Sequence, residues 1–227
     1  MPVAVFDIDG TLTDTFDVDV ECYEEAIRDE LGLDIPSDWP TFDEVTDAAI
    51  LRTACERLGR PVPDEETQDR IARRIAALLE EVLEREPERF RAIPGAPDIF
   101  GVLKDLGWNV AMATGAWRAS ALVKLRGAGI PHHDVPLASS SDYPERAEII
   151  RHAVRGLSAE GSGPFVYIGD GVWDGRASLS LSYSFIGVAT GSRGARLKEV
   201  GAIAVVPDFQ DPTILAGHLQ RLANGTS

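Results

Sequence analysis

Cysteines and long apolar runs are both scarce in this sequence. The 227 residues include two cysteines, Cys22 and Cys55, with neither a CxxC pair nor a neighbouring histidine cluster that would suggest zinc. Both cysteines lie in segments with helical periodicity, so we expect buried reduced thiols rather than a disulfide. No stretch reaches the roughly 18 to 20 apolar residues of a membrane span, so we expect no transmembrane segment.

Basic side chains are also in short supply. The sequence has 22 lysines and arginines against 37 aspartates and glutamates, a formal net charge of -15. Such a surface repels both the nucleic-acid backbone and anionic membranes, so we expect neither as a partner. The first residues, MPVAVFDIDG, contain neither a basic segment nor an apolar leader, and we therefore expect a cytoplasmic protein.

The overall composition is typical of a globular protein, and 227 residues are enough for one medium domain with a small insertion. After residue 95, short apolar runs alternate with helical patterns, and each run is too short for a helix and too apolar for an exposed strand. These runs are 109–113, 134–138, 165–168, 184–188 and 202–206, and residues 3–6 are of the same type. The alternation predicts an α/β fold with a Rossmann-like, mostly parallel sheet flanked by helices.

A helical insertion separates the first of these strands from the second. Residues 17–86 contain no convincing strand but show three amphipathic periods, the last of them at Ile71, Ile75, Leu78 and Val82. We therefore predict a core domain made of residues 1–16 and 87–227 and an inserted all-helical domain of residues 17–86. Hinges are expected near residues 13–17 and 86–94.

Four aspartates follow two of the predicted strands. Asp7 and Asp9 lie just beyond residues 3–6, and Asp170 and Asp174 lie beyond residues 165–168. Because open parallel sheets bind ligands at the carboxyl edge of their strands, we expect these side chains to meet there. Clustered carboxylates repel one another and need a divalent cation or shared protons, and an all-oxygen ligand set favours Mg²⁺.

Two further segments supply groups that suit a phosphate. Thr114 and Gly115 end the strand at 109–113 with a hydroxyl and an accessible main-chain N–H. Arg146 falls in the first turn of a helix that Pro144 opens, where free N–H groups and the guanidinium fork both favour an anion. Each of these motifs is weak evidence of a phosphate site when taken alone. The order of all of them along the chain is much more specific for such a site.

That order resembles the haloacid dehalogenase superfamily of phosphohydrolases. Residues 5–14 are similar to its first motif, 112–115 to its second, Arg146 to its third and 169–174 to its fourth. The third motif departs from the usual lysine followed by proline. The helical insertion is similar to the mobile cap of the phosphoglycolate phosphatase-like and β-phosphoglucomutase-like branch.

The resemblance implies a Mg²⁺-dependent phosphatase that hydrolyses a small phosphorylated metabolite through an aspartyl-phosphate. Asp7 would be the nucleophile, and Asp9 would protonate the leaving group and later activate water. The metal would be held by the Asp7 side chain, the Asp9 main-chain carbonyl and Asp170. Asp174 would orient a metal-bound water or Asp170 itself.

The resemblance also implies where the substrate binds. The implied phosphate ligands are Thr114, Gly115 and Arg146. Trp117 and Trp173 each follow a motif closely and are candidates for lining the cavity, although packing is the simpler explanation for both. In the insertion, Arg52 and Arg60 are candidate contacts for an anionic substrate.

Other activities use the same fold. β-Phosphoglucomutase chemistry needs the same core residues, and a non-catalytic phospho-ligand-binding protein is a further alternative. Haloacid dehalogenation is disfavoured, because it needs neither a proton shuttle at Asp9 nor Mg²⁺. Phosphonoacetaldehyde hydrolysis needs a cap lysine, and residues 15–90 contain none. The chain is compatible with a monomer or a homodimer.

Overall fold

The computed structural model describes residues 1–36, 38–157 and 163–225. Its main feature is a six-stranded sheet in the order β5-β4-β1-β6-β7-β8, in which every neighbouring pair is parallel. The strands are β1 Val3–Phe6, β4 Asn109–Ala113, β5 Leu137–Ala138, β6 Phe165–Gly169, β7 Ser184–Val188 and β8 Ala204–Val206. The predicted Rossmann-like α/β fold is confirmed.

β1 lies in the middle of the sheet, and its side chains alternate between the two faces. Ala4 and Phe6 belong to the apolar cluster on one face, and Val3 and Val5 belong to the cluster on the other. None of the four is exposed to solvent. Burial on both faces explains why this strand is an unbroken apolar run rather than an alternating one.

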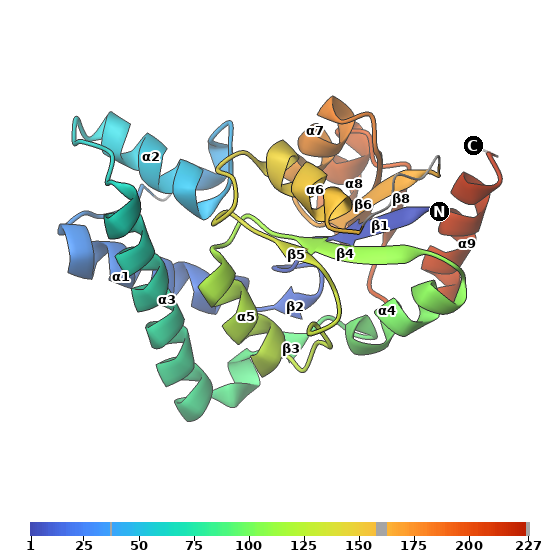
Figure 1. Cartoon of the computed structure of the whole chain (residues 1–227), viewed down its shortest axis with the longest axis horizontal. Coiled ribbons are helices and arrows are strands. Elements are labelled where there is room, and N and C mark those ends of the chain that lie inside the picture. The colour runs from blue at the N-terminus through green and yellow to red at the C-terminus, as the bar shows by residue number, and fades with distance from the viewer. Residues whose placement is uncertain (37, 158–162, 226–227) are drawn as a thin grey trace.

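Helices cover both faces of the sheet (Figure 1). The helices on one face are α4 Ala96–Asp105, α5 Arg118–Gly127 and α9 Pro212–Ala223, and those on the other are α6 Arg146–Arg155, α7 Val172–Ser180 and α8 Gly191–Glu199. Because the strands are parallel, their carboxyl ends share one edge of the sheet. The loops after β1, β4 and β6 therefore meet at that edge.

A helical insertion with its own apolar core lies between β1 and β4. It contains α1 Phe16–Leu31, the 3-10 helix Trp39–Thr41, α2 Asp47–Arg57 and α3 Glu65–Arg85. Leu51, Ile71 and Leu79 are completely buried in its centre. In Figure 1 the insertion lies to the left of the sheet, with α3 packed along α5. The helical insertion predicted between the first two motifs is confirmed.

A two-stranded antiparallel ribbon joins the insertion to the core. β2 Thr13–Asp14 pairs with β3 Arg91–Ala92, and a 3-10 turn, Pro87–Arg89, precedes β3. The two crossings between core and insertion therefore lie side by side, within the segments expected to be hinges. Sequence reasoning missed the pairing, because strands of this length show no periodic pattern.

Two strands begin later than predicted. The run at 134–138 forms a strand only over Leu137–Ala138, because the proline at position 136 has no N–H for the sheet ladder. The run at 202–206 forms a strand only from Ala204, because the N–H of Ala202 donates to a carbonyl of α8 instead.

Both cysteines are free and buried, as predicted. Cys22 lies on α1 and Cys55 on α2. Among the helices of the described residues, none is both long and apolar enough to cross a bilayer.

We expect Phe6→Ala to destabilise the core strongly. The buried ring lies 5.3 Å from the ring of Phe100 and 5.9 Å from that of Phe209, in edge-to-face arrangements. Removing a buried aromatic ring leaves a cavity and costs about 3–5 kcal/mol of the free energy of unfolding, measurable by urea denaturation. The control, Ile203→Ala, changes a residue that is 54% exposed and should cost no more than about 0.5 kcal/mol. Equal losses would contradict this account of the core.

Candidate active site

The loop after β1 brings Asp7 and Asp9 to the carboxyl edge of the sheet. The N–H of Asp7 still donates to the carbonyl of Ile168 at 2.9 Å, and the Asp7 side chain is 6% exposed. Gly10 then turns the chain with φ of +73°, which strains residues that have a side chain. A Cβ at Gly10 would lie 2.2 Å from Oδ2 of Asp170. Glycine therefore lets the loop after β1 pass directly beside the loop after β6.

Three carboxylates from the loop after β1 and the segment after β6 form one cluster. One oxygen each of Asp7, Asp170 and Asp174 lies within 4.8 Å of the others. Asp174 is completely buried in the first turn of α7, where it accepts a hydrogen bond from the N–H of Gly171 at 2.9 Å. The structure thus brings together the acidic residues of the first and fourth motifs. The carboxylate of Asp9 is not part of this cluster. The expected metal ligand from Asp9 is its main-chain carbonyl rather than its side chain.

Burial and mutual repulsion determine the protonation of the cluster. Burial and the charge of Asp174 raise the pKa of Asp7 well above its ordinary value, and Arg146 opposes them only in part. The same two causes raise the pKa of Asp170 to about 7. A divalent cation would relieve this repulsion, and an all-oxygen ligand set suits a hard cation such as Mg²⁺. The residues present therefore fit a metal site.

Arg146 joins the cluster from α6, which begins at this residue rather than at Pro144. Its Nη1 lies 3.0 Å from Oδ1 of Asp174 and 3.4 Å from Oδ1 of Asp7. Its Nη2 donates to the carbonyl of Val45 at 2.6 Å, and its buried Nε has no hydrogen-bond partner among the described residues. The arginine assigned to the third motif by position thus lies beside the acidic residues of the first and fourth.

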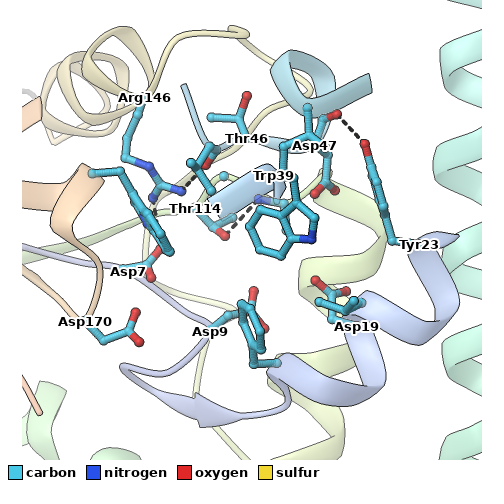
Figure 2. Close-up of a pocket in the computed structure, with 17 residues that line it drawn as sticks. Asp7, Asp9, Asp19, Tyr23, Trp39, Thr46, Asp47, Thr114, Arg146 and Asp170 are labelled. Atoms are coloured by element: carbon cyan, nitrogen blue, oxygen red, sulfur yellow. Dashed lines mark hydrogen bonds and ion pairs between the residues drawn. The ribbon is translucent and has the colours of Figure 1, made fainter. Parts of the chain in front are cut away.

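Thr114 and Gly115 follow β4 and reach the same place. The hydroxyl oxygen of Thr114 accepts a hydrogen bond from the N–H of Ala116 at 3.1 Å, and its side chain is buried. A Cβ at Gly115 would lie 2.3 Å from Nη2 of Arg146, so the guanidinium packs directly on this glycine. All four motifs converge on one pocket (Figure 2). Its lining residues from these motifs are Asp7, Asp9, Thr114, Gly115, Arg146, Asp170 and Trp173.

The insertion supplies the opposite wall of this pocket. Its lining residues on that side are Phe16, Asp19, Val20, Tyr23, Trp39, Val45, Thr46, Asp47 and Ile50. In Figure 2, Asp7 and Asp170 lie at one end of the pocket, and Asp19 and Asp47 lie at the other, beyond the indole of Trp39. The pocket is therefore acidic at both ends and aromatic between them.

Of the four further candidates, one lines the pocket. Trp173 does so from the first turn of α7. Trp117 is buried instead against the ring of Tyr23, with the ring centroids 6.0 Å apart. Arg52 and Arg60 are not among the lining residues. Arg52 lies on α2 and Arg60 in the segment that follows it, and each lines a different surface hollow. The expectation that these arginines contact an anionic substrate finds no support in the structure.

A loop of the insertion is hydrogen-bonded to the core beside the phosphate-binding motifs. The N–H of Asp47 donates to the carbonyl of Gly115 at 2.8 Å, and the hydroxyl of Thr46 donates to the carbonyl of Pro144 at 2.7 Å. In the other direction, the N–H of Trp117 donates to Oδ2 of Asp47 at 2.7 Å. The start of α2 is therefore docked on the loops that follow β4 and β5.

Sequence reasoning missed a buried lysine beside Asp9. Lys124, on α5, is completely buried, and its Nζ lies 2.6 Å from Oδ2 of Asp9 and 2.8 Å from Oδ2 of Asp19 on α1. The hydroxyl of Thr15 donates to the other oxygen of Asp9 at 2.9 Å. Burial lowers the pKa of Lys124, but the nearby carboxylates outweigh it and the pKa is raised. The sequence does offer one indication that this lysine is buried, since it lies between two apolar residues of a helix.

Asp19 and Asp47 form a second acidic pair, at the insertion end of the pocket. Burial raises the pKa of Asp19 to about 6, although Lys124 opposes the shift. Burial and the charge of Asp19 raise the pKa of Asp47 to about 8. Burial therefore favours the neutral form of Asp47 in the ligand-free pocket, whereas a cationic group placed beside it would favour the carboxylate.

Residues 1–180 match the model of the haloacid dehalogenase-like hydrolase family, so the chain belongs to this family. A protein of Dickeya dadantii (strain 3937) named "Probable phosphatase IndB" is 28% identical over 231 residues, which cover 98% of this chain and 96% of that protein. The phosphoglycolate phosphatase of Mesorhizobium japonicum is 22% identical over 226 residues, 98% of each chain. The crystal structure of a hydrolase from Pseudomonas syringae shares the fold with a TM-score of 0.74 and 21% identity, and the match covers 98% of this chain and all of that one.

These matches confirm the family predicted from the order of the motifs. They also confirm the branch that has a helical insertion between the first and second motifs. The chain is therefore a hydrolase of this family, with phosphatases among its relatives.

We expect Lys124→Met to cost about 3 kcal/mol of the free energy of unfolding, because it leaves the partly buried carboxylates of Asp9 and Asp19 without their cation. Adding Asp19→Asn removes one of the two stranded charges. The double variant should therefore be more stable than the sum of the single effects predicts, by about 1–3 kcal/mol. Urea denaturation of the four proteins measures this coupling. Lys104→Met, at an exposed position of α4, is the control. Strictly additive effects would show that the ion pairs do not form.

We expect Asp47→Asn to stabilise the protein increasingly as the pH rises. The pKa of Asp47 is about 8 in the folded state against an ordinary value of 3.8, so the folded state binds more protons between these values. Wild-type stability then falls as the pH rises through this range, and the asparagine variant escapes that fall. Melting temperatures of both proteins, measured from about pH 4 to about pH 9, test the trend. A difference that is independent of pH would refute it, and Asp43→Asn, at an exposed position, is the matched control.

Proposed function

We propose that the protein is a Mg²⁺-dependent phosphatase that hydrolyses a small phosphorylated metabolite through an aspartyl-phosphate on Asp7. The observation that supports this most directly is the meeting of Asp7, Asp170 and Arg146 at one pocket. Together they offer a carboxylate nucleophile, a second metal-binding carboxylate and a cation for the phosphoryl group. Family membership supports the hydrolytic reaction class.

In the first step, an oxygen of Asp7 attacks phosphorus and the alcohol leaves. In the second, water attacks the phosphorus of the aspartyl-phosphate, which releases inorganic phosphate and restores the carboxylate. A bound Mg²⁺ would be held by the side chains of Asp7 and Asp170 and the main-chain carbonyl of Asp9, and it would supply the positive charge that lets an anionic nucleophile approach a phosphate. Asp174, buried and bonded to Arg146, would keep the arginine and the Asp170 loop in position.

Asp9 would move the proton in both steps. It would protonate the departing alkoxide first and accept a proton from the attacking water second. Its two oxygens are held by Thr15 and Lys124, at 2.9 and 2.6 Å, which fixes the plane of the carboxylate. Such fixed orientation serves proton transfer, because the acid must lie within hydrogen-bond reach of the leaving oxygen.

The phosphoryl oxygens would be bound by Thr114, Gly115 and Arg146. The hydroxyl of Thr114 and the N–H of Gly115 are neutral donors at the end of β4, and the guanidinium supplies charge. Because Arg146 already contacts Asp7, it lies where negative charge accumulates during transfer. The arginine would therefore lower the barrier as well as bind the substrate.

The helical insertion, residues 17–86, would act as a cap on the core made of residues 1–16 and 87–227. Its docked loop contacts the segments around Gly115 and Pro144, next to the reacting groups. Closure of the cap would exclude bulk water and complete the substrate cavity. The β2–β3 ribbon is the place where the cap would hinge.

We expect purified protein to release phosphate from 4-nitrophenyl phosphate only when Mg²⁺ is supplied. Asp7→Asn removes the nucleophile and should lower kcat by at least about 10⁴-fold. Asp105→Asn, a matched change at an exposed position of α4, should leave kcat within about twofold. Retained turnover in Asp7→Asn would remove Asp7 as the nucleophile.

Two other outcomes would favour the alternatives. Conversion of a sugar phosphate to its isomer without net phosphate release would favour a phosphomutase. Tight binding of a phosphorylated ligand without turnover, in the presence of Mg²⁺, would favour a non-catalytic binding protein.

A further inference from the structure

The wall that the insertion adds to the pocket determines what the leaving group can be. If the phosphoryl group lies between Asp7, Thr114 and Arg146, the alcohol of the ester extends toward the insertion, since the core closes the pocket behind Asp7. Figure 2 shows that Asp19, Trp39 and Asp47 lie on that side. The chemistry of this wall therefore selects the alcohol.

Positive charge is confined to the phosphoryl end of the pocket. Among the described residues that line it, five are aspartates and Arg146 is the single cationic side chain. The guanidinium is bonded to Asp7 and Asp174, which places its charge beside phosphorus rather than beside the alcohol.

Lys124 does not supply a cation to the leaving group. It is absent from the lining residues, is completely buried and is paired with Asp9 and Asp19. Asp47 is either a carboxylate or a neutral acid, and neither form carries the positive charge that an anionic leaving group needs. A carboxylate or second phosphate on the alcohol would therefore be desolvated without a counter-charge, at a large cost in free energy.

The uncharged part of the wall is mainly aromatic. Phe16, Tyr23 and Trp39 line it from the insertion, and Trp173 faces them from α7. The rings of Phe16 and Trp39 have centroids 5.7 Å apart, and Phe16 is 42% exposed. Exposed aromatic surface that adjoins a pocket is typical of a ligand-binding surface, and flat rings stack on it favourably.

Asp47 provides a polar contact within this aromatic wall. Its Oδ2 accepts the N–H of Trp117, and its main-chain carbonyl accepts the hydroxyl of Tyr23 at 2.8 Å, so the residue is held in place. Its Oδ1 has no hydrogen-bond partner among the described residues. That oxygen suits a hydrogen-bond donor or a cationic group on the substrate.

We propose that the site takes the phosphate monoester of an uncharged or cationic alcohol that bears a flat aromatic or unsaturated ring and a hydrogen-bond donor, and that it rejects esters whose alcohol is anionic. This inference rests on the proposed phosphatase function. The substrate class follows from Trp39, Phe16 and Asp47, which would contact the alcohol, and not from the residues that bind the phosphoryl group.

Four phosphate esters with the same reacting group test the inference on the wild-type protein with Mg²⁺. They are benzyl phosphate, 4-(aminomethyl)benzyl phosphate, 4-carboxybenzyl phosphate and ethyl phosphate. We expect kcat/KM for the aminomethyl ester to exceed that for the carboxy ester by about 100-fold, and benzyl phosphate to exceed ethyl phosphate by at least about 10-fold.

Two variants assign the effects to residues. Trp39→Ala should lower kcat/KM for benzyl phosphate at least about fivefold more than for ethyl phosphate. Asp47→Asn should lower the ratio of kcat/KM for the aminomethyl ester to that for the carboxy ester by about 10-fold, because asparagine cannot become a carboxylate. Tyr183→Ala removes a partly buried aromatic side chain outside the pocket. It is the matched control and should leave both kcat/KM ratios unchanged.

The outcomes separate this inference from the function on which it rests. If the carboxy ester is hydrolysed as fast as the aminomethyl ester, the substrate class is wrong while the phosphatase function stands. If neither these esters nor 4-nitrophenyl phosphate releases phosphate with Mg²⁺, both are wrong. If the ratios hold in wild type but Trp39→Ala and Asp47→Asn leave them unchanged, the wall does not set the specificity and the inference fails.

Discussion

The site depends on one electrostatic constraint: acidic side chains from two strand ends are buried together where they repel one another. Asp7, Asp170 and Asp174 lie within 4.8 Å of each other, and Arg146 is the cation that contacts two of them. The fold accepts this arrangement because the residual negative charge can be met by a bound cation. The repulsion between these carboxylates is therefore the same interaction that would give a divalent ion its affinity for the site.

A second buried charge network links the proposed proton-transfer residue to the insertion. Lys124 belongs to a core helix, Asp9 to the loop after β1, and Asp19 to the first helix of the insertion. Three separate elements must be in place for all of these charges to be paired. Folding of the insertion against the core and orientation of Asp9 are consequently coupled, because a displaced α1 would leave Lys124 with one of its two partners missing.

The sequence was sufficient for the architecture and for the core side of the site. Most of those residues follow the ends of β1, β4 and β6, which the apolar runs mark clearly, and Arg146 lies at the start of a helix with its own sequence signal. The insertion side was not predictable, because helical periodicity shows which face of α1 is buried but not which residues meet the core. Asp19, Trp39 and Asp47 come from three different elements of the insertion, and only tertiary packing brings them to one wall. Lys124 was missed for a related reason, since its two anionic partners are distant in sequence.

The distribution of charge along the pocket would also orient the proposed substrate. A phosphate ester is a dianion at one end, and Arg146 together with a bound metal would attract that end toward Asp7. The other end of the pocket is acidic and aromatic, so it repels the phosphate and accepts the alcohol. A reversed substrate would place a dianion beside Asp19 and lose the contacts with Arg146, which is unfavourable on both counts. Orientation would thus follow from placing a single cationic side chain at one end of an acidic pocket, since no basic residue of the insertion is among the described residues that line it.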